Sequence, residues 1–509
     1  MFKIKYLSEK NLVFGNRQEE KDPRIGLKYF GPYKHSSEST ISDKIRVGII
    51  GDKSTIEKTK QVLELLKEPI SSYEPNKWLY LPYPGMSPKT SFNCSIEISP
   101  NWQQTILISE IDRILKIIDN NERIGEAAEL YFQKIQNIRS EDNLPDVIIC
   151  SLPKLIEYHC GISERTRGAK TPKPTELQSQ LEEFKRNNQK FLTEWGIVPY
   201  IKEERRVKGY DFRNCLKGKT MGLKDAIPIQ LIKETTLDAV LGYEPSKKTV
   251  KQSPATFAWN FSTGLFYKSN GKPWRLAKLR EDTCYVGISF FRDKLSSNKD
   301  IQTSMAQVFA HTGEGLVLRG TDVYVDEKLK EAHMTAEQSE NLLSDVLKKY
   351  ENIAKRNPVR VVIHKKTLFS EAEVEGFTKA IGNLKKDFVT ITTRKQGIRF
   401  MRCGSYPVLR GTMISLSEDE HILFTSGYIP RIRTYPGHRI PQPLLIKHKG
   451  DSEIIEICDE ILGLTKLNWN TTAFSTYNPI TIEFSEKVGD ILSELKKGSV
   501  VQDHYRFYM

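Results

Sequence analysis

The amino-acid sequence predicts an α/β protein with two domains. In the first half of the chain, short apolar runs alternate with amphipathic helical patterns; from about residue 275 the order changes to paired strands, a long helix and a return strand. Strands that alternate with helices are typical of parallel sheets, whereas apolar runs joined by short turns are typical of antiparallel hairpins. A chain of 509 residues is long enough for two to four domains with cores of their own.

The first half of the chain is expected to form a parallel sheet with helical connections. In chain order, the expected elements are a strand at 45–50, a helix at 54–66, a strand at 146–151, a helix near 154–158 and a strand at 195–200. Ser54 or Thr55 would cap the first helix, because their hydroxyls accept hydrogen bonds from free backbone amides. Gly48 and Gly51 form only a fragment of a phosphate-binding glycine pattern, so we expect turn glycines there. The proline-rich stretch at 70–102 reads as an irregular connection.

The second half of the chain is expected to form a mixed sheet. In chain order, the expected elements are a strand at 284–291, a hairpin with strands at 307–310 and 315–319, a helix at 336–355 and a strand at 359–364. Within the long helix, Leu343, Leu347 and Tyr350 recur at helical spacing and mark the side that faces the core. No internal repeat is evident.

Composition narrows the class of protein. The net charge is +13 and the isoelectric point is near 9.1. This balance suits a polyanionic partner such as nucleic acid, although basic surfaces are also common without one. The seven cysteines are scattered and include no Cys-x-x-Cys pair, which indicates reduced thiols and no zinc site. No apolar run approaches the roughly 20 residues of a spanning helix, and no signal peptide is evident, so we expect a cytoplasmic protein without a membrane partner.

Three stretches carry a family resemblance. Residues 22–32 begin Asp-Pro-Arg and end Phe-Gly-Pro; residues 258–274 begin Ala-Trp-Asn and end Gly-Lys-Pro-Trp; residues 469–482 begin Trp-Asn-Thr-Thr. In this order they resemble short prokaryotic Argonautes, which consist of MID and PIWI domains only. The resemblance implies a Rossmann-like MID domain after an N-terminal segment in residues 1–275, and an RNase H-like PIWI domain in residues 276–509.

Four polar side chains are candidates for binding a terminal phosphate. Arg213 and Lys217 are spaced so that both face one side of a helix, and Lys268 would end an amphipathic helix. With the amide of Gln230, such cations can bind phosphate through charge-assisted hydrogen bonds. The alternative is that they are exposed residues on helix surfaces, the usual place of a lysine. The resemblance implies that Lys217, Gln230 and Lys268 belong to the MID pocket for the guide 5′ phosphate, whereas Arg213 stands where the family has a tyrosine or histidine.

The C-terminal residues are a candidate part of the same pocket. The last six residues are rich in aromatic side chains, so we expect them to be docked rather than frayed. In related Argonautes the terminal carboxylate reaches the MID pocket and helps to hold a divalent cation. The resemblance therefore implies a structural Mg²⁺ at the 5′ phosphate, held in part by the carboxylate of Met509. A tail that packs only for stability is the alternative.

The residues at the expected nuclease site differ from those of cleaving relatives. The family resemblance places a metal-binding aspartate at the position of Ser289 and another at the position of Lys366. A hydroxyl is a poor ligand for Mg²⁺, and an ammonium group repels it, so we expect no catalytic residues and no cleavage. Asp293, Glu314 and Glu486 are nearby acids that we interpret as surface or channel residues. A structural role or a phosphate contact is expected for His364.

Cations in the second half of the chain are expected to line a nucleic-acid groove. The candidates that we single out are Arg394, Arg399, Arg410, Arg431 and Arg433, with Lys395, Arg402, His438 and Arg439 close to them in sequence. Tyr406 and Tyr435 are interleaved with these cations. Basic residues mixed with aromatic ones suit a nucleic acid backbone. The alternative for each of these cations is a solvated position on the surface.

The resemblance implies a guide-binding protein without catalysis of its own. It would bind a short 5′-phosphorylated guide RNA and recognise complementary single-stranded target DNA by base pairing. Short Argonautes work with a separate APAZ-domain effector, most often a TIR protein, otherwise a sirtuin-like NAD hydrolase or a nuclease, against plasmids and phages. A higher oligomer on activation is a further implication. Tyr29, Phe30 and Tyr33 are candidates for the partner-binding surface if they are exposed.

Two other functions remain open from the sequence. The first is an active guide-directed endonuclease, against which the missing acids at positions 289 and 366 speak. The second is a non-catalytic RNA-binding scaffold, which would bind nucleic acid regardless of the 5′ end. A test of phosphate dependence separates the scaffold from the guide-binding protein.

Overall fold

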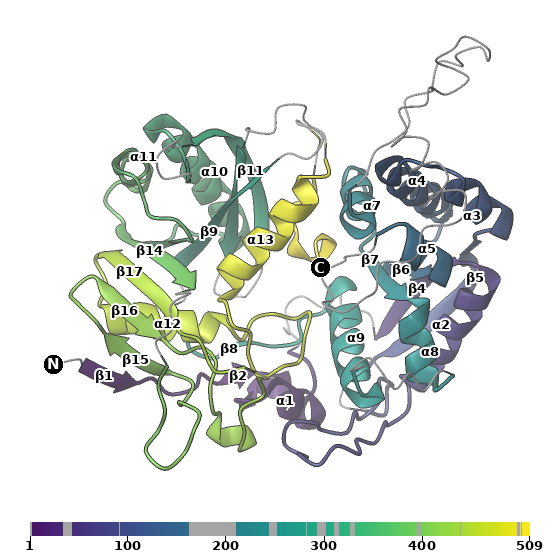
Figure 1. Cartoon of the computed structure of the whole chain (residues 1–509), viewed down its shortest axis with the longest axis horizontal. Coiled ribbons are helices and arrows are strands. Elements are labelled where there is room, and N and C mark those ends of the chain that lie inside the picture. The colour runs from purple at the N-terminus through teal and green to yellow at the C-terminus, as the bar shows by residue number, and fades with distance from the viewer. Residues whose placement is uncertain are drawn as a thin grey trace, which may run out of the picture.

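The structure is a computed structural model of the chain, and it divides into two lobes with the C-terminal residues between them (Figure 1). Residues 3–33, 43–90, 92–161, 210–243, 252–280, 282–292, 302–309, 315–325, 331–393, 399–437, 439–495, 499 and 501–509 are described. The strand expected at 195–200 lies outside these residues.

The first lobe contains a four-stranded parallel sheet. Its strands, in spatial order, are β5 (Ser95–Thr105), β4 (Lys44–Gly51), β6 (Val147–Leu152) and β7 (Ile229–Lys233). The two strands expected at 45–50 and 146–151 are confirmed as β4 and β6. Part of the stretch at 70–102, expected to be irregular, is instead in β5. Its Pro100 is tolerated because β5 is an edge strand whose register with β4 shifts near this point.

Helices cover the faces of this sheet and fill the rest of the lobe. They are α2 (Lys53–Leu65), α3 (Ile108–Leu115), α4 (Asn120–Arg139), α5 (Lys154–His159), α7 (Phe212–Met221), α8 (Glu234–Leu241) and α9 (Pro254–Lys268). Helix α1 (Pro23–Phe30) instead packs against the short strands at Leu12–Val13 and Glu19–Glu20. The cap of α2 is Asp52, not Ser54 or Thr55, because its carboxylate accepts a hydrogen bond of 2.8 Å from the Thr55 amide. A Cβ atom at Gly51 would lie 2.5 Å from the Thr55 hydroxyl, so close packing against the helix start requires glycine there.

The second lobe contains a ten-stranded mixed sheet. In spatial order its strands are β1 (Lys3–Tyr6), β15 (Thr412–Ser415), β16 (Glu420–Leu423), β17 (Leu444–Gly450), β14 (Lys385–Thr393), β13 (Arg360–Lys365), β9 (Thr283–Arg292), β10 (Gln302–Phe309), β11 (Gly315–Val325) and β12 (Ala332–His333). The antiparallel hairpin and the return strand expected from the sequence are confirmed, and β13 runs parallel to both β9 and β14.

The N-terminal segment contributes to the second lobe as well. Strand β1 pairs with β15 at one edge of the ten-stranded sheet, although the sequence placed it with the first domain. Strands β2 (Leu12–Val13) and β3 (Glu19–Glu20) form a small sheet with β8 (Arg275–Leu276), which brings the two ends of the first 276 residues together. The domain boundary near residue 275 stays a prediction.

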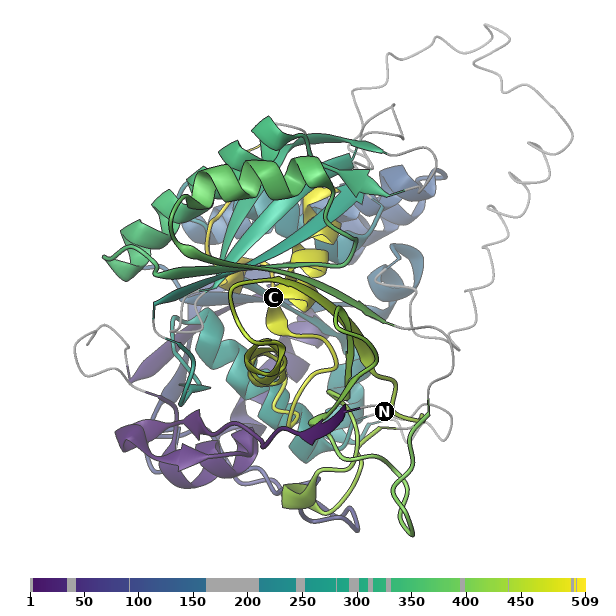
Figure 2. The same ribbon diagram turned by 90° about the vertical axis from the view of Figure 1, so that its left-hand side faces the viewer.

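Four helices lie on the two faces of the large sheet (Figure 2). Helices α10 (Ala336–Ala354) and α11 (Glu371–Ile381) pack on one face, against Val286, Ile288 and their neighbours. Helices α12 (Ile454–Leu464) and α13 (Ile480–Leu492) pack on the other, against Tyr285 and its neighbours. A Cβ atom at Gly287 would lie 2.1 Å from the Thr481 carbonyl oxygen, so only glycine allows α13 to approach β9 this closely.

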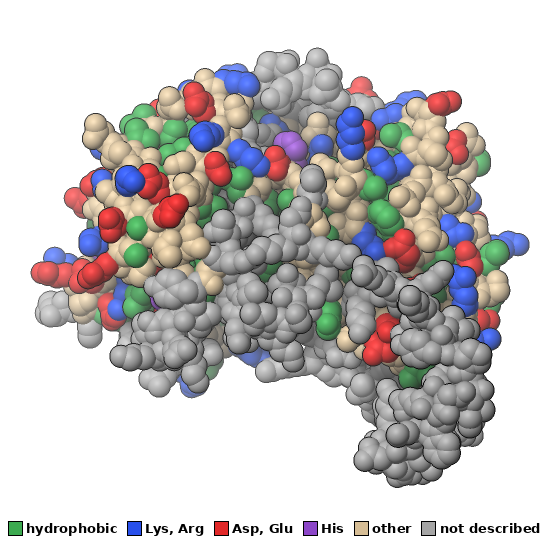
Figure 3. Space-filling view, turned by 90° about the horizontal axis from the view of Figure 1, so that it is seen from above, with side chains coloured by type: hydrophobic (Ala, Val, Ile, Leu, Met, Phe, Trp, Pro, Cys, Tyr) green, Lys and Arg blue, Asp and Glu red, His purple; other side chains and the backbone are tan. Residues whose placement is uncertain are grey.

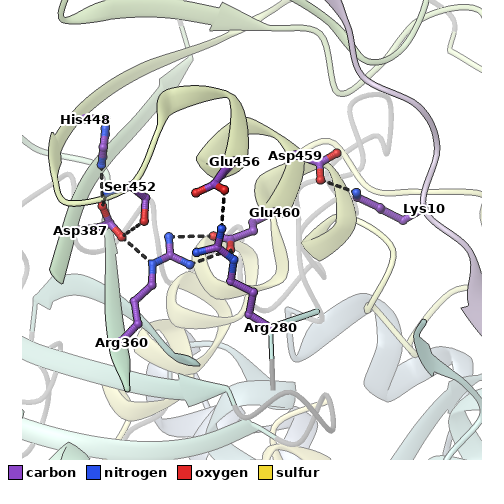
Figure 4. Close-up of polar contacts among 9 residues, drawn as sticks. All are labelled: Lys10, Arg280, Arg360, Asp387, His448, Ser452, Glu456, Asp459 and Glu460. Atoms are coloured by element: carbon purple, nitrogen blue, oxygen red, sulfur yellow. Dashed lines mark hydrogen bonds and ion pairs between the residues drawn. The ribbon is translucent and has the colours of Figure 1, made fainter. Parts of the chain in front are cut away.

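A buried ionic network joins the large sheet to α12 (Figure 4). At the start of β13, Arg360 donates to the carboxylates of Asp387, at 2.6 Å, and Glu460, at 2.7 Å. Asp387 also accepts from Ser452, at 2.8 Å, and lies 2.8 Å from the imidazole of His448. Burial alone would raise the pKa of Asp387, but hydrogen bonds from His448, Arg360 and Ser452 outweigh it and hold this pKa well below its usual value.

Two further expectations concerned the redox state of the cysteines and the presence of membrane-spanning helices. All seven cysteines are free thiols, and six of them are buried. None of the helices in the described part of the chain combines the length and apolar character needed to cross a membrane.

Candidate phosphate pocket and nucleic-acid interface

The four candidate phosphate ligands come together between the lobes. Arg213 and Lys217 lie on α7, which Asp211 caps by accepting from the Asn214 amide at 2.9 Å. Lys268 is the last residue of α9, as expected, and Gln230 lies on β7. These side chains, brought together by the fold, are called the anion pocket here.

Hydrogen bonds fix two of the three cations in the anion pocket. Lys268 donates from Nζ to the Oε1 atom of Gln230. Arg213 donates to the backbone oxygen of Tyr508 at 3.3 Å and to the side chain of Asn214 at 3.2 Å. Lys217 is 1% exposed, and its Nζ atom is buried without a hydrogen-bond partner among the described residues.

The electrostatics of the anion pocket are those of a site that lacks its counter-charge. Burial and the neighbouring cations Arg213 and Lys268 lower the pKa of Lys217 well below its usual value. Burial and Arg213 lower the pKa of Lys268 to about 7, and burial lowers the pKa of Arg213 as well. In the described part of the chain, no carboxylate pairs with any of these three cations. A bound anion would supply the negative charge that balances these cations.

Lys487 is a further cation near the pocket that the sequence did not single out. It lies on α13, in the second lobe, and its charge contributes to lowering the pKa of Lys217. Its Nζ atom pairs with Glu483 at 2.8 Å, one turn earlier. The Glu-x-x-x-Lys spacing is common on helix surfaces and offered no signal of a site.

The C-terminal residues are docked beside the anion pocket, which confirms one sequence prediction. The Tyr505 ring stacks on Phe484 with the ring centroids 3.3 Å apart, and Met509 is buried. Tyr508 receives the hydrogen bond from Arg213. Helix α13 and these residues therefore bring the second lobe to a pocket whose other ligands come from the first. The metal-holding role of the Met509 carboxylate stays a prediction.

The positions of the expected nuclease site also converge, on one end of β9 and β13. The hydroxyl of Ser289 donates to the backbone oxygen of Ser485 at 2.8 Å. The ammonium group of Lys366 forms an ion pair with Glu486, the next residue along α13. No group of three metal-ligating side chains is found among the described residues; Asp293 and Glu314 lie outside them.

His364 has the structural role that the sequence suggested. It is buried in β13, and its Nδ1 atom lies 2.7 Å from the hydroxyl of Thr481. Burial and the charge of Arg360 lower the pKa of His364 to about 3, so the imidazole is neutral at physiological pH.

The proposed nucleic-acid groove needs one correction. Arg410 is buried, with its guanidinium bonded to the Glu9 carboxylate at 2.7 Å, the Thr465 hydroxyl at 2.8 Å and backbone oxygens. It is a structural residue and cannot reach a nucleic acid backbone. The sequence showed its charge but not its partner Glu9, which lies at the opposite end of the chain.

The other groove candidates differ in their exposure and in their interaction partners. Arg431 pairs with Glu20 at 2.9 Å, and both Arg431 and Arg433 lie over the ring of the half-exposed Trp78. Arg399 is exposed; Arg394, with Lys395 and His438, lies outside the described residues. On the face in Figure 3, cationic and acidic side chains are interspersed on both lobes where the side chains are coloured by type.

The two lobes together define an Argonaute-like fold. No protein-family model and no curated protein sequence matches the chain. Among solved structures, Clostridium butyricum Argonaute bound to a guide DNA and a 19-mer target DNA matches with a TM-score of 0.63 and 15% identity. Drosophila Piwi matches with a TM-score of 0.58 and 11% identity, and Marinitoga piezophila Argonaute in complex with a 5′ OH guide RNA with 0.53 and 12%.

These matches cover nearly all of this chain but only part of each neighbour. Each of the three covers 99% of the chain, against 54% of the Clostridium protein, 56% of Piwi and 59% of the Marinitoga protein. The chain therefore spans a little over half the length of the Argonautes that it resembles in fold.

Proposed function

We propose that this chain is a guide-binding subunit, which loads a short 5′-phosphorylated RNA and recognises complementary single-stranded DNA. The observation that carries the proposal is the anion pocket, in which two buried lysines and the half-buried Arg213 meet in an Argonaute-like fold. None of these three cations forms an ion pair with a side-chain carboxylate of the described residues. Burying an unpaired cation lowers the stability of the fold unless a ligand compensates for its charge. Such a cluster therefore indicates a binding site rather than a stabilising interaction. Solved neighbours of the same fold are bound to guide DNA, guide RNA or target DNA, which supports nucleic acid as the ligand.

The proposal predicts a strong preference for a 5′ phosphate. An RNA of about 20 nucleotides with a 5′ phosphate should bind about 30-fold or more tightly than the same RNA with a 5′ hydroxyl, because two or three charge-assisted hydrogen bonds depend on that group. Fluorescence anisotropy with the two RNAs measures the ratio. Equal affinities would contradict the proposal and favour the scaffold alternative.

We also propose that the chain does not cut its target. The support is that Ser289 is engaged with backbone and that Lys366 places an ammonium group beside Glu486, which neutralises a carboxylate that a metal would need. The pure protein, loaded with guide and supplied with Mg²⁺ or Mn²⁺, is expected to leave a labelled complementary strand intact. Metal-dependent cleavage that disappears in Asp293→Asn would favour the endonuclease alternative.

A structural Mg²⁺ beside the 5′ phosphate is a smaller part of the proposal. The groups that fit it are the phosphate itself and the carboxylate of Met509, which is buried near Arg213 through its neighbour Tyr508. Both supply the oxygen ligands that Mg²⁺ prefers. Guide affinity that is independent of Mg²⁺ and of chelators would remove the metal from the proposal.

The effector is proposed to reside in a separate protein, an APAZ-domain partner that carries a TIR domain or another effector. This part rests on the sequence resemblance. Tyr29 and Phe30 are exposed on α1 and remain candidates for the partner surface, whereas Tyr33 is buried under Arg275 and is excluded. Co-purification with the product of a neighbouring gene tests for the partner.

A further inference from the structure

We propose that binding of a terminal phosphate in the anion pocket is coupled to the uptake of protons by Lys217 and Lys268. This inference rests on the proposed function, since it concerns the same pocket, but it adds a property that guide binding alone does not require. In the empty pocket, burial without a counter-ion disfavours the ammonium form of both side chains, and the phosphate favours that form as it binds.

The geometry that supports the coupling is the enclosure of the two lysines. Lys217 is 1% exposed and Lys268 is 2% exposed, so neither ammonium group has water to solvate its charge. Lys217 has no hydrogen-bond partner among the described residues, and Lys268 has only the neutral amide oxygen of Gln230. When a lysine is buried without a counter-ion, burial disfavours its charged form, so the side chain releases its proton while the fold stays intact.

The groups that face the lysines from the surrounding elements favour the neutral form. Arg213 from α7 acts on both lysines, and Lys487 from α13 acts on Lys217; each adds positive charge. Among the described residues, the buried thiol of Cys150 on β6 has the opposing effect on both lysines, but its own pKa is raised to about 12, so it carries no charge near neutral pH. Glu483 pairs with Lys487, and Tyr505 acts on Arg213 rather than on the lysines.

The direction of the pH dependence follows from these surroundings. The pKa of Lys268 is about 7 in the empty pocket, so its amine is mostly neutral at pH 8, and burial with the neighbouring cations also lowers the pKa of Lys217 well below its usual value. A phosphate dianion favours their charged forms and raises both pKa values. Binding at pH 8 therefore takes up protons, and affinity falls by up to about tenfold per pH unit for each proton as the pH rises above 7. Below about pH 6 the phosphate itself gains a proton and affinity falls again.

Titration calorimetry with the full chain and a 5′-phosphorylated RNA tests the coupling. Titrations at pH 8 in two buffers of different ionisation enthalpy give the number of protons taken up, which we expect to be between about one and two. The same RNA with a 5′ hydroxyl is expected to take up fewer than half a proton. A preference for the phosphorylated RNA with no proton uptake and no pH dependence would overturn the coupling but leave the proposed function intact. Absence of the preference would overturn the proposed function itself.

The variant Lys268→Arg provides a matched control. Arginine keeps its proton even when it is buried, so this position no longer takes one up. We expect proton uptake at pH 8 to fall by about one half or more, and the loss of affinity between pH 7 and pH 9 to become shallower. Uptake that equals the wild-type value in a variant with an unchanged melting temperature would contradict the role of Lys268.

Discussion

Replacing Lys217 and Lys268 together by methionine is expected to weaken binding of a 5′-phosphorylated RNA by about two to four orders of magnitude. Each lysine would donate charge-assisted hydrogen bonds to the phosphate, and each such bond contributes roughly 1.5–3 kcal/mol. Binding of the RNA with a 5′ hydroxyl should change little. Anisotropy titrations with both RNAs, at one fixed salt concentration, measure the two effects.

The same substitution is expected to leave the empty protein at least as stable as the wild type. Methionine has a similar length and no polar group, so it removes two buried amino groups, of which that of Lys217 has no hydrogen-bond partner among the described residues. Thermal unfolding of the empty proteins checks this expectation. If the variant loses stability as well as binding, unfolding rather than the missing phosphate contacts explains the loss of binding.

A control variant replaces two exposed lysines by methionine. Lys348 on α10 and Lys379 on α11 are more than two-thirds exposed, and each pairs only with a nearby surface acid. Their replacement changes the net charge as much as the double pocket variant does. If both variants lose the same affinity, long-range charge rather than contact with the phosphate explains the effect, and the pocket assignment fails.

Arg360→Met is expected to destabilise the chain by about 3–5 kcal/mol, because it leaves the buried carboxylate of Asp387 without its arginine and Glu460 with only the more distant Arg280, at 3.7 Å. Asp387 and Glu460 both accept from this guanidinium, and Asp387 has no contact with solvent that could replace it. Urea unfolding at pH 7 measures the loss. The matched control is Arg356→Met, since the exposed ion pair of Arg356 with Asp282 contributes at most about 1 kcal/mol.

The network also predicts a pH dependence of stability. Because the pKa of Asp387 is lowered in the folded protein, its ionised form stabilises the fold above the pKa that it has in the unfolded chain. This contribution is lost as the pH falls below about 4. The acid dependence should be shallower in Arg360→Met, since the hydrogen bond that contributes to lowering the pKa is gone. An equal slope in both proteins would exclude Asp387 as its source.

The strands that the sequence predicted are those with unbroken apolar runs. The central residues of strands β4, β6, β9 and β13 are buried on both faces, so apolar residues follow one another there, as in Val361–Ile363 of β13. Strand β5 was missed because it is an edge strand with mixed polarity and a proline. The position of β1 in the second sheet could not be predicted either, since its partner β15 lies some 400 residues away.

The residues of the candidate site also fall into those that the sequence could show and those that only the folded chain brings together. Arg213 and Lys217 share one face of α7 because of their spacing, which a sequence displays directly. Lys487 belongs to the other lobe, and only the packing of α13 brings it near. Arg410 was assigned to the groove by its charge, but burial and the ion pair with Glu9 decide its role. Contacts between distant segments carry no local pattern, so they appear only in the folded chain.

The anion pocket has a consequence for how long the protein lasts in a cell. Its four side chains come from α7, β7 and α9 in one lobe, and α13 and the C-terminal residues of the other lobe lie beside them. We therefore expect the docked lobes to bind the ligand more tightly than separated lobes. A ligand that binds only the docked form stabilises it by RT ln(1 + [L]/Kd), about 2.7 kcal/mol at a hundredfold excess over Kd. Chains without such a ligand open more often and are the first substrates for proteases. The steady-state amount of protein would then follow the supply of its ligand, and unloaded copies would be removed by turnover.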